Sequence, residues 1–119
     1  MLDFYNNLNL NYKILIIAGS LKDNKHVNSI KTELTKNNLQ YTSHVYSAHK
    51  NTSSVLDLIS YYKKLTSRII YITVAGRSNA LSGVVACNTD SVVIACPPIK
   101  DTGFLININS TLQMPSGTP

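Results

Sequence analysis

The sequence predicts a three-layer α/β domain with a doubly wound parallel sheet, of the flavodoxin or Rossmann kind. Short apolar runs alternate along the chain with segments whose apolar residues recur at helical spacing. Each of the first three apolar runs ends in a turn of small, polar residues. The 119 residues are 44% hydrophobic, which suits one globular domain. Such a strand-helix alternation is typical of parallel sheets with right-handed crossovers.

Four apolar runs are expected to be the strands: Lys13–Ala18, Tyr41–Tyr46, Ile69–Val74 and Ser91–Cys96. The third run is apolar on both faces, which predicts a central position in the sheet. The fourth is also expected to be buried. Pro97 and Pro98 end it, because proline cannot continue a central strand.

Helical spacing predicts the connecting segments. Residues 24–37 place Val27, Ile30 and Leu34 on one face, and Asp23 or Asn24 is expected to cap this helix. A second apolar stripe consists of Val55, Leu58, Ile59, Tyr62 and Leu65.

Three further expectations complete the chain. Ser54 with Asp57 resembles a capping box at the start of the second helix. Asn79 to Ala86 predicts a short helix. The segment 103–112 fits a helix, although its residues 106–109 alternate as in a strand.

Composition excludes several classes of protein. The net charge is +5, but the basic residues are scattered and do not interleave with aromatic residues, which argues against nucleic-acid binding. No apolar run approaches the roughly 20 residues that span a bilayer. Residues 1–12 show no signal-peptide pattern and are expected to be a flexible lead-in to a single domain over residues 13–119.

Cysteines and histidines give no metal-site pattern. Cys87 and Cys96 match no zinc spacing, and the three histidines show no ligand spacing. Cys96 ends an apolar run, which favours a buried thiol in a reducing compartment. We expect His26 to be structural and His44 to lie at the surface.

The polar turns carry the candidate site. Ligands of open α/β sheets bind at the carboxyl ends of the strands. We therefore expect one site built from Ser20, Asp23, His49, Lys50, Arg77 and Ser78. The guanidinium of Arg77 suits a phosphate or a carboxylate. No dinucleotide fingerprint or P-loop is present, so ATP and NAD are unsupported.

Five short motifs stand out along the chain: Gly19-Ser20-x-x-Asp23, Ser47-Ala48-His49-Lys50, Ala75-Gly76-Arg77-Ser78-Asn79, Cys96-Pro97-Pro98 and Met114-Pro115-Ser116-Gly117. In this order and spacing they resemble the aminoimidazole ribonucleotide (AIR) carboxylase family of purine biosynthesis, from about residue 13 to the last residue. Class I members move a carboxylate within N-carboxyaminoimidazole ribonucleotide, whereas class II members carboxylate AIR with CO2. Lys50 and the loop 76–79 are similar to class II, including the carboxylase domain of the animal bifunctional enzyme.

The resemblance implies a role for each matching residue. His49 would be the general acid and base. Ser20 and Asp23 would hold the ribose phosphate part of the nucleotide, and Ser47 and Lys50 would lie near the phosphate. The pocket for the imidazole and CO2 would be lined by Gly76, Arg77, Ser78 and Asn79. It also implies AIR and CO2 as small-molecule substrates, no cofactor, and a cytoplasmic homo-oligomer, octameric in the family.

Two departures from the family keep other functions open. The family usually has a serine where this chain has Lys22, which would either add phosphate affinity or obstruct the ribose. Family members also continue for about another strand and one or two helices beyond the position of Pro119, so a C-terminal part is expected to be missing. The alternatives to a class II carboxylase are therefore a class I mutase and a catalytically silent nucleotide-binding or assembly paralogue.

Overall fold

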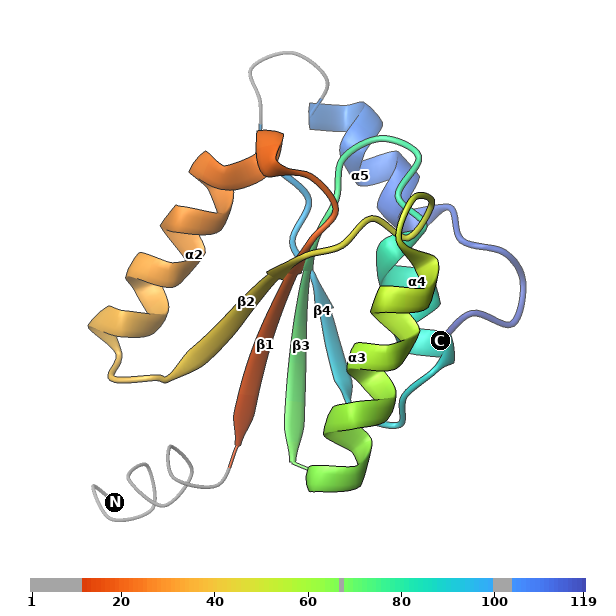
Figure 1. The fold of residues 1–119 in the computed structure, drawn as a ribbon. Coiled ribbons are helices and arrows are strands. Elements are labelled where there is room, and N and C mark those ends of the chain that lie inside the picture. The colour runs from red at the N-terminus through yellow and green to blue at the C-terminus, as the bar shows by residue number, and fades with distance from the viewer. Residues whose placement is uncertain (1–11, 67, 100–103) are drawn as a thin grey trace.

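The computed structural model describes residues 12–66, 68–99 and 104–119, so nearly all of the expected lead-in lies outside the described residues. Strands and helices alternate along the chain (Figure 1). The elements are β1 (Lys13–Ala18), the 3-10 helix η1 (Leu21–Asp23), α2 (Asn24–Lys36), β2 (Tyr41–Val45), α3 (Thr52–Leu65), β3 (Ile69–Val74), α4 (Leu81–Cys87), β4 (Val92–Ala95) and α5 (Phe104–Leu112). Among the described residues, none of these helices is long and apolar enough to cross a membrane.

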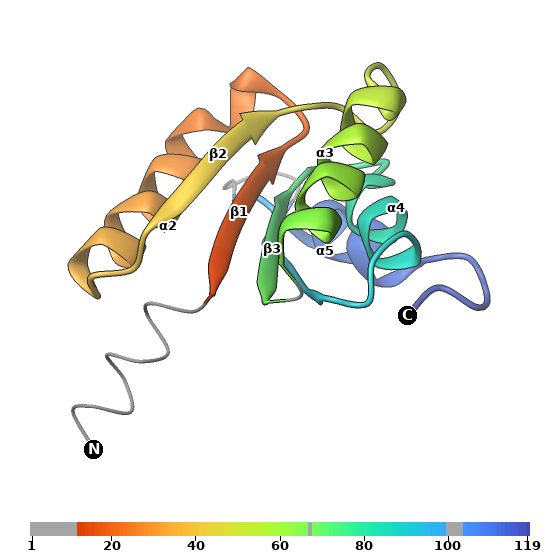
Figure 2. The same cartoon turned by 60° about the horizontal axis from the view of Figure 1, so that its bottom comes forward.

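The four strands form one parallel sheet in the order β2-β1-β3-β4. The α/β class and the parallel sheet are thus confirmed. Figure 2 shows α2 on one side of the sheet and α3 and α4 on the other. The chain first moves outward from β1 to β2 and then returns past β1 to β3, so the strand order reverses between β1 and β3. That reversal is the place where doubly wound folds bind ligands.

The core lies on both faces of the two central strands. Because side chains alternate along a strand, Leu15 and Ile17 of β1 face α3 and α4, whereas Ile16 faces α2. Val55 completes the first layer and Val27 the second, and all five side chains are buried. This two-sided burial explains why β1 and β3 read as continuous apolar runs rather than alternating ones.

The fourth strand differs from the prediction of a buried strand. β4 is an edge strand, and Val92 and Ile94 are 57% and 46% exposed. Their register partners, Ile70 and Ile72 of β3, belong to the layer that packs on α2. The helix α2 crosses the β1–β2 side of the sheet, so β4 stays uncovered on that face by the described residues.

Helix capping was predicted correctly in position for α2 and wrongly for α3. Asp23 is the N-cap residue of α2, but its side chain makes no capping hydrogen bond there. The helix α3 already begins at Thr52 after Asn51, so Ser54 lies inside it and forms no capping box. The ambiguous last segment is the helix α5.

Candidate functional site

The turns that follow β1, β2 and β3 meet in one concavity of about 150 Å³ at the carboxyl edge of the sheet. It lies at the reversal of strand order, where the first two turns are each anchored to the end of a neighbouring strand. Gly19 N donates to Val74 O at 2.9 Å, and Tyr46 N donates to Ala18 O at 2.9 Å. Its lining residues are Gly19, Ser20, Asp23, Ser47, Ala48, His49, Ala75, Gly76, Arg77, Ser78, Ala80 and Leu81.

The first turn presents Ser20 and Asp23. The hydroxyl of Ser20 accepts a hydrogen bond from Lys22 N at 3.1 Å and so starts the tight helix η1. Asp23 ends η1 and is buried at the junction with α2. The tight turn therefore brings a hydroxyl and a carboxylate, three residues apart, to the same concavity.

The second turn presents His49. The hydroxyl of Ser47 accepts from His49 N and Lys50 N, each at 3.3 Å, and Asn51 N donates to Ser47 O at 2.8 Å. These bonds fix the turn while His49 stays exposed at the rim of the concavity. Lys50 is also exposed but does not line the concavity. Of the two candidate charges in this turn, only the imidazole faces the site.

The third turn contributes Gly76, Arg77 and Ser78. A Cβ at Gly76 would lie 3.3 Å from Asn107 Oδ1, so glycine permits the close approach of α5 to this loop. Ser78 has φ 55°, a left-handed conformation that is uncommon for serine. Such a backbone persists only where its surroundings impose it, and it is frequent in ligand-binding loops.

Asn79 is buried and holds the third turn in place through hydrogen bonds. It is 8% exposed, and its Nδ2 donates to Ser82 Oγ and to Thr111 Oγ1, both at 3.1 Å. Its Oδ1 accepts from Ser82 N at 3.3 Å, and its backbone N donates to Ser110 Oγ at 2.6 Å. The side-chain amide thus ties the third turn to α4 and α5, and Asn79 does not line the concavity.

Sequence reasoning missed two kinds of site residue. Ala48, Ala75 and Ala80 line the concavity with small side chains, and their place next to strand ends was the available signal. Nothing in the local sequence pointed to Asn107, whose Nδ2 donates to Pro98 O at 3.0 Å and which lies beneath Gly76. It comes from a helix about thirty residues farther along the chain.

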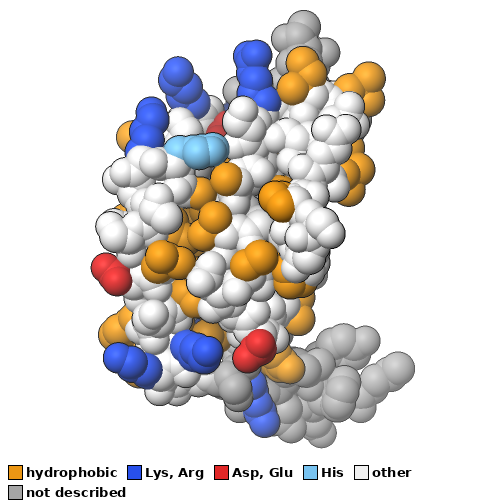
Figure 3. Space-filling view, turned by 90° about the vertical axis from the view of Figure 1, so that its right-hand side faces the viewer, with side chains coloured by type: hydrophobic (Ala, Val, Ile, Leu, Met, Phe, Trp, Pro, Cys, Tyr) orange, Lys and Arg blue, Asp and Glu red, His pale blue; other side chains and the backbone are white. Residues whose placement is uncertain are grey.

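The electrostatics at this edge are positive. Figure 3 shows basic side chains and a histidine at the end of the molecule where the strands end, and further basic side chains at the opposite end. Arg77 is exposed within the third turn, as is Lys22 beside the first. An anionic ligand would be attracted to this edge. Among the described residues, no group of three or more His, Cys, Asp or Glu side chains is arranged to hold a metal ion.

Two histidine and cysteine expectations need correction. His44 is half-buried rather than a surface residue; its ring stacks on Tyr46, and burial lowers its pKa. Cys96 is half-buried, Cys96 N donates to Thr73 O, and burial raises the pKa of its thiol. That thiol therefore stays protonated near neutral pH. Neither side chain lines the concavity.

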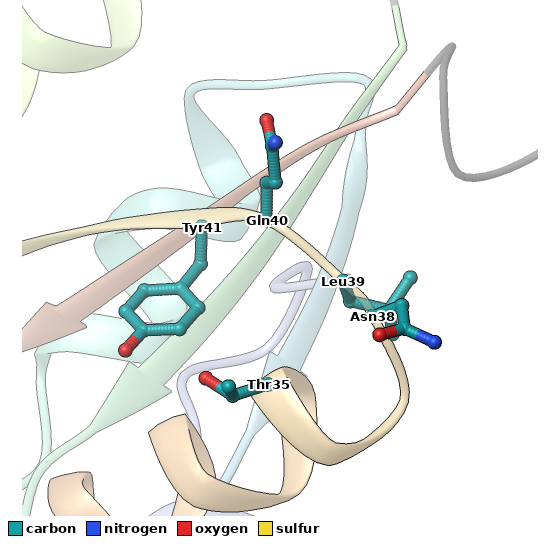
Figure 4. Close-up of a pocket in the computed structure, with 5 residues that line it drawn as sticks. All are labelled: Thr35, Asn38, Leu39, Gln40 and Tyr41. Carbon is teal, nitrogen blue, oxygen red and sulfur yellow. The ribbon is translucent and has the colours of Figure 1, made fainter.

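A larger concavity lies elsewhere among the described residues. It measures about 610 Å³ and sits at the α2–β2 turn, at the amino end of β2 (Figure 4). No charged side chain lines it, and it opens widely to solvent; its residues are Thr35, Asn38, Leu39, Gln40 and Tyr41. Size alone is therefore a poor guide here, and the smaller concavity with convergent polar groups is the better candidate.

Comparisons with known proteins show the family of the chain. A family model described as AIR carboxylase matches residues 13–119. The chain is 40% identical over 104 residues to a phosphoribosylaminoimidazole carboxylase of Treponema denticola, covering 87% of this chain and 65% of that protein. A carboxylase of the same name from Archaeoglobus fulgidus is 41% identical over 105 residues, covering 88% of this chain and 57% of that protein.

A solved structure and a longer bifunctional relative also match the chain. The crystal structure of Treponema denticola PurE superimposes with a TM-score of 0.83 at 38% identity, covering 92% of this chain and 69% of that chain. The bifunctional phosphoribosylaminoimidazole carboxylase/phosphoribosylaminoimidazole succinocarboxamide synthetase of Drosophila melanogaster is 36% identical, with 24% of its length covered. The chain thus spans less than two thirds of the curated relatives it matches here.

Proposed function

The chain belongs to the AIR carboxylase family, and on that premise we propose that it carboxylates AIR with CO2 to give 4-carboxy-5-aminoimidazole ribonucleotide, in de novo purine biosynthesis. The observation that carries the proposal is the concavity in which His49, Asp23 and Arg77 converge from three different turns. The arrangement offers a proton acceptor, a hydroxyl-binding carboxylate and a cation to one small ligand.

The reaction needs little more than these groups. Carbon 4 of AIR is an enamine-like nucleophile that forms the new bond to the carbon of CO2. The proton on carbon 4 must then leave, and an imidazole takes up and returns protons near neutral pH. His49 is exposed at the rim, where its ring can reach a heterocycle held in the concavity. Holding two small reactants together supplies part of the rate.

The remaining lining residues support binding. Ser20 and Asp23 suit ribose hydroxyls, because a carboxylate accepts hydrogen bonds from two of them. Ser47 positions the turn of His49, and the loop of Gly76, Arg77 and Ser78 closes the other side toward CO2. In this proposal Asn79 acts indirectly, by fixing that loop.

We keep two other functions for comparison. A class I mutase would move the carboxylate of N-carboxyaminoimidazole ribonucleotide to carbon 4, using the same histidine. A silent paralogue would bind nucleotide without turnover. Product formation from AIR and bicarbonate, measured beside product formation from N-carboxyaminoimidazole ribonucleotide, separates the two chemistries. Binding of AIR without either product identifies the silent protein.

Replacing the imidazole tests the mechanism. We predict that His49→Asn lowers carboxylation by about 10² to 10⁴, the usual contribution of a positioned acid or base. The variant should keep its circular dichroism spectrum and bind AIR, because His49 is exposed and lies outside the core. Turnover within a few-fold of the parent protein would remove His49 from the mechanism.

We also propose that the protein works as a homo-oligomer. The helix α5 turns polar Asn107 and Thr111 inward, while Leu105 and Leu112 are 72% and 75% exposed. The apolar edge strand β4 is exposed as well. Such surfaces are typical of subunit contacts. Light scattering after size exclusion measures the assembly, and a strict monomer would contradict this proposal.

A further inference from the structure

Asn107 is a buried polar residue of α5 that contacts two segments at the carboxyl edge of the sheet. It is 7% exposed, and its Nδ2 donates to Pro98 O at 3.0 Å. Its carboxamide also lies against Gly76. Gly76 follows β3 and Pro98 follows β4, and these two strands are neighbours in the sheet. Asn107 therefore joins the third turn to the segment after β4.

The contact with Gly76 explains why this position carries a glycine. Outside the neighbouring residues, the three heavy atoms nearest to a Cβ at Gly76 all belong to Asn107: Oδ1 at 3.3 Å, Cγ at 3.7 Å and Nδ2 at 3.8 Å. Among the described residues, the glycine with a left-handed backbone is Gly117, so the conformation of Gly76 does not require glycine. The missing side chain leaves room for the carboxamide.

The type of residue at position 107 suits both contacts. Asparagine is among the weaker helix formers, and a buried carboxamide costs free energy unless it is hydrogen-bonded. In α5 the bond to Pro98 O offsets that cost. An aliphatic side chain of similar size would fill the same space without holding Pro98.

Buried carboxamides hold the third turn at both ends. Asn79 lies near the end of the turn and bonds to α4 and α5, whereas Asn107 lies beneath its start at Gly76. Arg77 and Ser78 lie between these two points, and Ser78 has φ 55°. Because both ends are held, even a small displacement of Gly76 reorients Arg77 and Ser78.

We propose that Asn107 is a positioning residue of the candidate site, which sets the separation between Gly76 and Pro98 and thereby the shape of the wall that faces the imidazole and CO2. This inference rests on the proposed function. Asn107 does not line the concavity, so it acts through Gly76, which does. Misplacing reactants by roughly 1 Å costs about 10²-fold in rate, so a shift of a fraction of that distance should cost about tenfold.

Paired substitutions test this role. Gly76→Ala places a methyl group against Oδ1, and Asn107→Ala removes the carboxamide. Each change should lower kcat with AIR and CO2 by about tenfold, while KM for AIR changes less than about twofold. In the double variant the methyl group enters the space that the carboxamide leaves. Its kcat should therefore be no lower than that of Asn107→Ala, whereas independent effects would multiply to about a hundredfold.

Asn109→Ala is the matched control, since Asn109 is an exposed asparagine of the same helix. It should keep the kcat of the parent, and combined with Gly76→Ala it should leave the tenfold loss unchanged. Rates are compared per folded protein, with the folded fraction taken from circular dichroism under assay conditions. Multiplied losses in the Gly76→Ala, Asn107→Ala double variant overturn the inference. So do single variants that keep the kcat of the parent.

A measurement without substrate separates this inference from the proposed function. Ile99 lies beyond Asn107 as seen from Gly76, next to Pro98. In ¹⁵N-labelled protein, Gly76→Ala should therefore shift the amide signal of Ile99. In the Asn107→Ala background, the same change at Gly76 should leave that signal in place. If the parent protein does not turn AIR over, the proposed function fails and this signal decides the inference. A signal of Ile99 that ignores Gly76→Ala, or that shifts equally in both backgrounds, overturns it.

Discussion

Asn79→Ala is expected to destabilise the fold much more than an asparagine substitution at the surface. The side chain of Asn79 takes part in three hydrogen bonds, two from Nδ2 and one to Oδ1, and the residue is 8% exposed. A typical intramolecular hydrogen bond contributes about 1 kcal/mol net, and a partner left unsatisfied in a buried place costs about 1–3 kcal/mol. Losing all three bonds should therefore lower the free energy of unfolding by about 3 kcal/mol.

Asn88→Ala provides the matched control. Asn88 is exposed and its side chain makes one hydrogen bond, from Nδ2 to Val84 O at 2.7 Å. Its loss should cost less than about 1 kcal/mol. Urea unfolding followed by circular dichroism measures both variants against the parent protein. Equal midpoints for Asn79→Ala and Asn88→Ala would refute the view that Asn79 holds the third turn to α5.

Two further outcomes concern stability. Burial lowers the pKa of His44, so the unfolded chain binds the proton more readily than the folded protein does. The stability that neutral His44 contributes to the fold is therefore fully present above the unfolded pKa of about 6.5. It is lost as pH falls toward the lower pKa of the folded state. His44→Phe should therefore lose less stability between pH 7.5 and 5.5 than the parent in thermal unfolding, and an equal loss would argue against burial as the cause. Gly83→Val should destabilise the protein by about 1–3 kcal/mol, because a Cβ at residue 83 would already lie 3.0 Å from Met114 Sδ; an unchanged urea midpoint would contradict this packing.

The fold could be predicted where the spacing of apolar residues fitted only one kind of secondary structure. The run Ile69–Val74 could only be a strand buried on both faces, and β3 has those bounds. The run Ser91–Cys96 looked alike, yet β4 is an exposed edge. Apolar residues show that a strand is able to be buried. Whether it is buried depends on which helices cover that part of the sheet. The capping box was wrong because Ser54 could cap α3 only if that helix began three residues later than Thr52.

The candidate site was predictable as a set of turns but not in its details. Strand ends in a parallel sheet share one edge, so Ser20, His49 and Arg77 were expected together, and all three line one concavity. Local sequence could not show that Lys50 lies outside the concavity. Nor could it show that the amide of Asn79 turns inward, because its partners Ser110 and Thr111 lie more than thirty residues away.

The helix α5 links the geometry of the site to the outer surface of the molecule. Its inner face is polar and contacts the third turn at Asn79, by a hydrogen bond, and at Gly76, by close packing. Its outer face carries the exposed side chains of Leu105 and Leu112. A helix oriented in this way gains little apolar burial from the described fold, so a covering surface would stabilise it. Fixing α5 would also fix the loop that carries Arg77 and the left-handed Ser78. If the protein is the homo-oligomer proposed above and the partner subunit covers α5, assembly and substrate binding should strengthen each other.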